Sequence, residues 1–352
     1  PDRRHLGPAA AIAEKAQGRA PKQETDFRRA LEDKDVDALL VTTPDHWHAP
    51  MAILAAKAGK HVYVEKPCSH SPREGEILVE VARKHGRLVQ MGSQRRSIAN
   101  VNQMVREIHE GVVGKLFLAQ CFYSRRRPPI GFGKAVTPPA ELDWDLWQGP
   151  APRTEYRDNL HPYNWHWFWR WGTGEALNNG VHLLDVARWA MQVSFPTRVN
   201  SFGGRWHDVG LDDWEAPDTQ EIQLEFGRGR GISWFGRSCS TYGAPGYKAN
   251  GIVFFGSKGT VDYDGSGTYT VYDLENALSK AAKDERIKSV LVEVGLSPMG
   301  FGKMQEVRAA LLEFRKCKKP VWATFEMTGN GGYYLASAAD KIVVPPCADL
   351  ML

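Results

Sequence analysis

Two charged residues and a proline, Glu65-Lys66-Pro67, follow the apolar run His61–Val64 directly. A short apolar run of this kind predicts a buried strand, and open α/β sheets bind ligands at the carboxyl ends of their parallel strands. A lysine held there can donate to a hydroxyl or carbonyl that undergoes redox chemistry. Pro67 stiffens the turn and makes the Lys66–Pro67 bond a candidate for the cis form. A solvated Glu-Lys pair before a turn is the alternative, and the neighbouring segments decide between them.

Two further segments end in a similar way. Residues 36–43 predict a buried strand that closes on Thr42-Thr43-Pro44, and residues 88–91 predict a strand followed by Gly92-Ser93-Gln94. Between these strands, residues 50–58 predict a helix, and Ser71 opens another through a capping box. Strands that alternate with helices predict a parallel sheet covered on both faces, so the three turns are expected at one edge.

Aromatic residues dominate the next region, where six of the twelve tryptophans lie between positions 144 and 171. Four of them alternate with period two and predict a strand with one aromatic face, namely Trp165, Trp167, Trp169 and Trp171. Such a face either packs in the core or stacks on sugar rings, and both hold if the strand borders a cleft. Trp165, His166 and Trp169 are therefore candidate substrate contacts, as is Arg96.

Asn178, His182 and Asp185 follow at a spacing that puts them on one side of a helix. A lone histidine on a helix is otherwise a core residue. Arg95-Arg96 and Arg125-Arg126-Arg127 are basic spots, either solvated loop arginines or contacts to an anion or cofactor. Residues 221–226, 231–235 and 251–261 predict consecutive strands of an antiparallel sheet.

Three of these segments together resemble the Gfo/Idh/MocA oxidoreductases, relatives of glucose–fructose oxidoreductase and inositol dehydrogenase. They run from Asp37 to His48, from His61 to Pro67 and from Gln90 to Arg96, and the resemblance covers about residues 1–272. It implies an oxidoreductase that uses NAD or NADP on a sugar or polyol hydroxyl. It also implies a homo-oligomer that pairs through the sheet of the second domain.

The resemblance assigns roles to individual residues. Lys66 and His182 would polarise or deprotonate the hydroxyl. The family has an aspartate one turn before that histidine, where this chain has Asn178, which can orient a substrate without accepting a proton. Asp185 is expected to orient the imidazole of His182. The residues expected to line the cofactor are Thr42, Thr43, Pro44, His48, Glu65, Lys66 and Gln94.

The Gly-rich phosphate turn with which that family opens is absent from the sequence. The segment around Pro1-Asp2-Arg3-Arg4 resembles the part that follows the second strand of the family. We therefore expect the chain to keep the nicotinamide half of the site and to bind the dinucleotide weakly, because glycines let the backbone approach the pyrophosphate.

Residues 273–352 resemble another family, the signal peptide peptidases (protease IV), which have a ClpP/crotonase-like fold. The stretch from Gly331 to Ile342 carries most of this resemblance. Asn330 stands where active members have the nucleophilic serine, and Ser337 lies two helical turns further on. The segment from Gly295 to Gly300 also lacks the usual oxyanion turn. The resemblance thus implies a peptidase-related module without its nucleophile.

Composition narrows the class of protein further. The 352 residues are 42% hydrophobic and 24% charged with a net charge of +4, which is too mild to indicate a nucleic-acid partner. No apolar run approaches the roughly 18 residues of a membrane span. Five scattered cysteines predict neither a disulfide framework nor a metal site, and they favour a reducing, cytoplasmic setting.

The predicted architecture has three parts. Residues 1–123 form a partial Rossmann domain, residues 124–272 an α+β domain with an open, mostly antiparallel sheet, and residues 273–352 a partial ClpP/crotonase-like α/β segment. The presence of two families in one chain has two explanations: a recombined or misassembled reading frame that joins two gene fragments, or a genuine gene fusion. We favour the first. An inert chimeric fragment is the corresponding alternative for function. Sequencing the gene across the codons for residues 265–285 tests the misassembled reading frame. An uninterrupted reading frame with native flanking sequence would contradict it.

Overall fold

The computed structural model describes residues 1–240, 249–295 and 301–351. The chain forms two compact units, the first with residues 1–106, 117–254 and 263–269, and the second with residues 107–116, 255–262 and 270–352. The domain boundary predicted at residue 272 is close to the start of the longest segment of the second unit. Within the described residues, none of the helices combines the length and apolar character needed to cross a bilayer.

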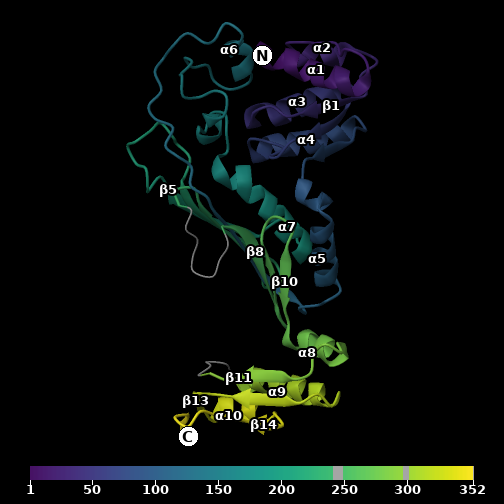
Figure 1. Ribbon diagram of the computed structural model, residues 1–352. Coiled ribbons are helices and arrows are strands. Elements are labelled where there is room, and N and C mark those ends of the chain that lie inside the picture. Colours follow the sequence, from purple (N-terminus) through teal and green to yellow (C-terminus); the bar gives the residue numbers. More distant parts are fainter. Residues whose placement is uncertain (241–248, 296–300, 352) are drawn as a thin grey trace. The chain divides into compact units, whose positions relative to one another are not determined.

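Helices and strands alternate through the N-terminal 109 residues, as the sequence predicted (Figure 1). In chain order they are η1 (Arg3–His5), α1 (Leu6–Gln17), α2 (Phe27–Glu32), β1 (Ala38–Val41), α3 (Asp45–Lys57), β2 (His61–Val64), α4 (Pro72–Lys84), β3 (Val89–Met91), η2 (Gln94–Ser97) and α5 (Ala99–His109). The helices η1 and η2 are 3-10 helices. The sequence analysis had no counterpart of α1.

Strands β1, β2 and β3 form a parallel sheet in that order. Val41 pairs with Val64, and Val64 pairs with Met91, so the last residues of the three strands are in register. The turns that follow them therefore lie at one edge of the sheet, which confirms the prediction. Val41 and Val64 are fully buried, together with Ala52 and Ala55 of α3. Leu40 is 65% exposed, so the prediction of a buried strand in a sheet covered on both faces is wrong for β1.

Helix α3 begins five residues earlier than the sequence predicted, at Asp45 rather than Pro50. Proline breaks the helical hydrogen-bond pattern, and this favoured a start at Pro50. In the structure Pro50 lies within the helix, and the carbonyl of Pro44 accepts from the N–H of Trp47 at 3.0 Å at its start. The earlier start places His48 in the first turns of the helix, beside the turn that follows β1.

The capping box of α4 is confirmed. The N–H of Glu74 donates to Ser71 Oγ at 3.4 Å, and the N–H of Ser71 donates to the Glu74 carboxylate at 3.3 Å. A cap of this type stabilises a helix by about 0.5–2 kcal/mol. It fixes the start of α4 shortly after the Glu65-Lys66-Pro67 turn.

A seven-stranded mixed sheet follows, in the order β10-β9-β8-β4-β7-β6-β5. Strand β4 pairs with β7 in parallel, whereas β7, β6 and β5 are antiparallel to one another. The elements are β4 (Leu116–Ser124), α6 (Trp144–Gln148), η3 (Asn164–Trp167), η4 (Ala176–Gly180), α7 (Val181–Met191), β5 (Arg198–Gly204), β6 (Thr219–Phe226), β7 (Arg230–Arg237), β8 (Asn250–Gly256), β9 (Thr260–Tyr263) and β10 (Tyr269–Tyr272).

The aromatic strand predicted over residues 165–171 is wrong. Residues 164–167 form the 3-10 helix η3, and the rest of the run is irregular. Trp165, Trp167 and Trp171 nevertheless share one buried cluster, while Trp169 is 52% exposed. Trp167 stacks on Trp214 with ring centroids 4.0 Å apart. Packing against a distant part of the chain thus overrides the period-two pattern.

The C-terminal segment consists of α8 (Leu274–Lys283), β11 (Val290–Glu293), α9 (Phe301–Arg315), β12 (Val321–Thr324), β13 (Met327–Gly329), α10 (Asn330–Ala336), β14 (Lys341–Ile342) and β15 (Asp349–Met351). Strands β11, β12 and β14 form a parallel sheet, and β13 pairs with β15 (Figure 1). A separate core of Leu278, Leu311, Phe314 and Val321 lies between the helices and this sheet. The predicted α/β character is confirmed.

Candidate functional site

Lys66 lies at the carboxyl end of β2, and the Lys66–Pro67 bond is cis. The ammonium Nζ of Lys66 donates to the backbone oxygen of Asn178 at 2.8 Å and to its side-chain Oδ1 at 3.1 Å. Both acceptors are neutral oxygens. Burial lowers the pKa of Lys66, although the carboxylates of Asp45 and Glu65 oppose that shift. Lys66 is therefore held by the two neutral oxygens of Asn178, in the position where an aspartate would have formed an ion pair with it.

Asn178 lies on η4, a π-helical turn that leads into α7. Such turns occur within α-helices mostly as single turns, frequently at functional sites. The turn packs tightly on β7, because a Cβ atom on Gly180 would lie 2.8 Å from the indole ring of Trp234. Asn178 is 8% exposed. This close packing fixes where the amide of Asn178 meets Lys66.

His182 and Lys66 line the same small crevice, together with Gly92 and Ser93 after β3. Burial lowers the pKa of His182 to about 4, and the charge of Lys66 adds to the effect. The imidazole is therefore neutral at pH 7 and able to accept a proton. The crevice has a volume of about 10 Å³, which is room for about one water molecule, so a substrate must open it.

Asp185 and Arg96, two further predicted site residues, pair with each other. The carboxylate of Asp185 accepts from Arg96 Nε at 2.8 Å and from Arg96 Nη2 at 2.9 Å. Arg96 also lies 4.9 Å over the ring of Trp189. This bidentate pair joins η2 to α7. Asp185 therefore binds Arg96, and it also lines the crevice that contains His182.

The other basic spot is also paired within the chain. Arg126 donates to the carbonyl of Cys239 at 2.9 Å, and Arg127 donates to the carboxylate of Glu175 at 3.2 Å. The alternative of a solvated loop arginine fits Arg126, whose side chain is 42% exposed, but it is wrong for Arg127, whose side chain is 23% exposed. The anion that Arg127 contacts is a buried side chain.

His48 connects two of the turns at the sheet edge. Its Nδ1 lies 2.6 Å from the carbonyl oxygen of Pro67, and its Nε2 lies 2.6 Å from that of Thr43. The side chain is 2% exposed. Because both ring nitrogens face backbone oxygens, neither is free to bind a cofactor. His48 instead holds the turn after β1 and the turn after β2 together.

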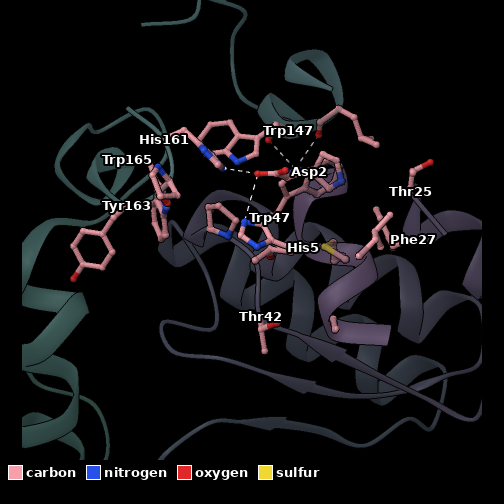
Figure 2. Close-up of a pocket in the computed structure, with 18 of the residues that line it drawn as sticks. Asp2, His5, Thr25, Phe27, Thr42, Trp47, Trp147, His161, Tyr163 and Trp165 are labelled. Atoms are coloured by element: carbon pink, nitrogen blue, oxygen red, sulfur yellow. Dashed lines mark hydrogen bonds and ion pairs between the residues drawn. The ribbon is translucent and has the colours of Figure 1, made fainter. Parts of the chain in front are cut away.

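A cavity of about 600 Å³ opens at the end of β1 (Figure 2). Such a volume is typical of small-molecule sites. It is lined by the predicted cofactor residues Thr42, Thr43 and Pro44, by the predicted substrate residues Trp165 and His166, and by further aromatic side chains, among them Phe27, Trp47, Trp147 and Tyr163. The hydroxyl of Thr43 is buried and has no hydrogen-bond partner among the described residues.

Several predicted site residues do not line this cavity. Lys66 and His182 line the separate crevice, and Trp169 lines another hollow with His46 and His70. Gln94 is exposed at the start of η2. The structure thus brings Thr42, Thr43, Pro44, Trp165 and His166 together, and it brings Lys66, Asn178 and His182 together.

Two buried carboxylates near the site were missed by the sequence analysis. Asp45 is 4% exposed, and burial raises its pKa although Thr173 Oγ1 donates to it at 2.7 Å. Glu175 is 3% exposed. Both lie within three residues of a predicted site residue, Pro44 or Asn178, and this proximity was the available signal.

Comparison with known protein families identifies the larger part of the chain. Residues 3–93 match the model described as oxidoreductase family, NAD-binding Rossmann fold, and residues 150–262 match the GFO/IDH/MocA C-terminal domain. The two models together match more than half of the 352 residues. Over this range the chain belongs to the Gfo/Idh/MocA oxidoreductase family. The resemblance predicted from the sequence is confirmed.

Two curated Gfo/Idh/MocA relatives match part of the chain. Inositol 2-dehydrogenase 4 of Saccharopolyspora erythraea is 34% identical over 110 residues, which is 31% of this chain and 32% of the relative. Levoglucosan dehydrogenase of Pseudarthrobacter phenanthrenivorans is 29% identical over 166 residues, 47% of this chain and 35% of the relative. The chain spans about a third of the length of these relatives.

Solved structures confirm the fold of this Gfo/Idh/MocA chain. The WlbA dehydrogenase from Bordetella pertussis, crystallised with NADH and UDP-GlcNAcA, superimposes with a TM-score of 0.56 at 22% identity. The match covers 76% of this chain and 69% of that structure. At this identity the likeness shows the fold alone, a Rossmann-type domain followed by a sheet domain.

Residues 313–349 match peptidase family S49, as the sequence predicted for the C-terminal segment. Asn330 begins α10, and the hydroxyl of Ser337 donates to the carbonyl of Tyr334 at 2.7 Å. Ser337 is therefore already engaged in a local helix contact. The predicted loss of the oxyanion turn concerns Gly295 to Gly300, of which residues 296–300 lie outside the described residues.

Proposed function

We propose that residues 1–272 carry the substrate side of an NAD- or NADP-dependent oxidoreductase acting on a sugar or polyol hydroxyl. One observation carries the proposal. Lys66, at the carboxyl edge of a parallel sheet, is held by Asn178 and shares a crevice with a neutral His182. Relatives named for inositol and levoglucosan support the substrate class.

The chemistry follows from the protonation states of the two side chains. As an ammonium, Lys66 donates to the substrate oxygen and stabilises the charge that develops there. The neutral imidazole of His182 accepts the hydroxyl proton. The amide of Asn178 fixes the direction in which Lys66 points. A nicotinamide ring, when bound, supplies the acceptor for the carbon-bound hydride.

The cavity beside β1 fits the nicotinamide end of the cofactor. Thr43 offers a buried hydroxyl without a partner, and the aromatic side chains of Trp47 and Trp165 offer apolar walls. The pyrophosphate, by contrast, normally lies on a Gly-rich turn at a helix N-terminus, and the 352 residues contain no G-x-G-x-x-G sequence. The residues present would therefore contact the nicotinamide end of the cofactor but not its pyrophosphate.

Isothermal titration of the 352-residue chain with NAD or NADP should accordingly show weak or no binding. Adding a Gly-rich β-α-β segment ahead of Pro1 should restore binding, because it supplies the backbone N–H groups that contact the pyrophosphate. Micromolar binding by the 352-residue chain would show that the Gly-rich turn is dispensable.

We further propose that the sheet of this region pairs with a second copy of the chain. The edge strand β5 exposes Val199 by 59% and Phe202 by 68%, and the nearby Trp206 is 51% exposed. Exposed apolar side chains clustered in this way are typical of interaction surfaces. Light scattering should show a dimer that Phe202→Asp converts to a monomer. A wild-type monomer at every concentration would contradict this proposal.

A further inference from the structure

Glu175 is a buried acid one turn before Asn178, and the chemistry above does not use it. Its side chain is 3% exposed. Glutamate is almost never buried to this degree unless it is paired. It directly precedes η4, the π-helical turn that carries Asn178 and Asn179. The charge of Glu175 also acts on Lys66.

The carboxylate of Glu175 is bound on one oxygen. Its Oε1 accepts from Asn179 Nδ2 and, at 3.2 Å, from Arg127 Nη2. Arg127 is itself held by the hydroxyls of Tyr123 at 3.4 Å and Tyr163 at 3.2 Å. Glu175 therefore ties the π-helical turn to the segment that follows β4.

Three polar atoms of this hydrogen-bond network are unpaired within the described residues. Glu175 Oε2, Arg127 Nε and Asn178 Nδ2 are buried and have no hydrogen-bond partner among the described residues. Buried polar atoms in folded proteins are nearly always paired, so each of these calls for an explanation. Asn178 Nδ2 belongs to the amide whose oxygen Lys66 contacts, and Glu175 and Arg127 both act on the charge of Lys66.

The charges around Lys66 come from several elements. Asp45 of α3, Glu65 after β2 and Glu175 each favour the ammonium form, whereas Arg127 disfavours it. The charge of Lys66 also acts on His182 and His166, and burial lowers the pKa of each to about 4, so both are neutral at pH 7. Burial is the largest influence and lowers the pKa of Lys66, and the three carboxylates oppose it while Arg127 adds to it.

We propose that Glu175 is a positioning residue of the Lys66 site. Its buried carboxylate holds the π-helical turn that presents Asn178 to Lys66, and its negative charge favours the ammonium form of the lysine. The proposal rests on the proposed function only in taking Lys66 as the reacting group. A role confined to stability would leave the titration of Lys66 unchanged.

The test is the titration of Lys66 in the 352-residue chain, labelled with ¹³Cε-lysine and followed by NMR. The Lys66 signal is the one missing from Lys66→Arg. In Glu175→Gln, which keeps the shape and one acceptor oxygen but removes the charge, the pKa of Lys66 should fall below its wild-type value. Neither cofactor nor sugar is needed, so this result is independent of whether the chain is a dehydrogenase.

Asp218→Asn is the matched control. Asp218 is 2% exposed and accepts from Arg205 at 3.1 Å, so the variant also removes a buried carboxylate from an arginine pair, but one that does not act on Lys66. It should leave the Lys66 titration at its wild-type position. An unchanged Lys66 pKa in Glu175→Gln would overturn the proposal. If that variant does not fold, Arg127→Gln carries the test: it should raise the pKa of Lys66, and no change or a fall would overturn the proposal.

Discussion

Lys66→Ala is expected to lower the turnover of a sugar or polyol by about 10²–10⁴-fold, the usual contribution of a group that transfers or donates a proton at the reacting atom. The variant removes the only group proposed to donate to the substrate oxygen. It also removes the donor that Asn178 accepts from at 2.8 and 3.1 Å, so the amide loses its partner. The effect should therefore appear in kcat.

The rate of nicotinamide reduction with inositol or levoglucosan measures this, in a chain that carries a Gly-rich segment ahead of Pro1. Lys60→Ala is the matched control, because Lys60 is also a buried lysine whose Nζ donates to a backbone oxygen, that of Asp33 at 2.7 Å. It should retain most of the turnover. Equal rates for Lys66→Ala and the parent protein would show that the catalytic assignment is wrong.

Trp167→Ala should cost about 3–5 kcal/mol in the free energy of unfolding, as large aromatic truncations in cores do. Trp167 is 2% exposed and stacks on Trp214 at 4.0 Å with an angle of 10° between the rings. Its ring also lies 5.3 Å from the guanidinium of Arg127. The truncation would thus open a cavity beside the Arg127–Glu175 pair.

Denaturant unfolding followed by circular dichroism measures the loss. The neighbouring Trp169→Ala serves as control, because its side chain is 52% exposed and such surface changes usually stay within about 0.5 kcal/mol. Similar losses for the two variants would contradict the finding that the tryptophans of this run have separate environments.

The parallel sheet could be predicted because its signals are local. Apolar runs such as His61–Val64, helix caps such as Ser71 and the turns after each strand all act within a few residues of sequence. The tryptophan run could not be predicted in this way. Trp167 is placed by Trp214, which is 47 positions away, and no periodicity within the run reports that contact.

The same limit applies to the site. Lys66 and His182 were predicted from their motifs, and the structure places them around one crevice. The pairing of Arg96 with Asp185 joins residues 89 positions apart, and that of Arg127 with Glu175 joins residues 48 positions apart. Arg96 and Arg127 therefore looked available for a substrate, anion or cofactor when read alone. Ion pairs of this kind depend on the tertiary fold, which the local sequence pattern does not specify.

The most direct test of the central claim is hydride transfer by the 352-residue chain with a Gly-rich segment added ahead of Pro1. Inositol or levoglucosan deuterated on its carbinol carbons would be incubated with excess NAD, and the nicotinamide ring analysed by mass spectrometry. We predict that one deuterium appears in the reduced ring and that Lys66→Ala slows its appearance by about 10²–10⁴-fold. A reduced ring without deuterium, no reduction at saturating NAD, or the same labelling in Lys66→Ala would contradict the account.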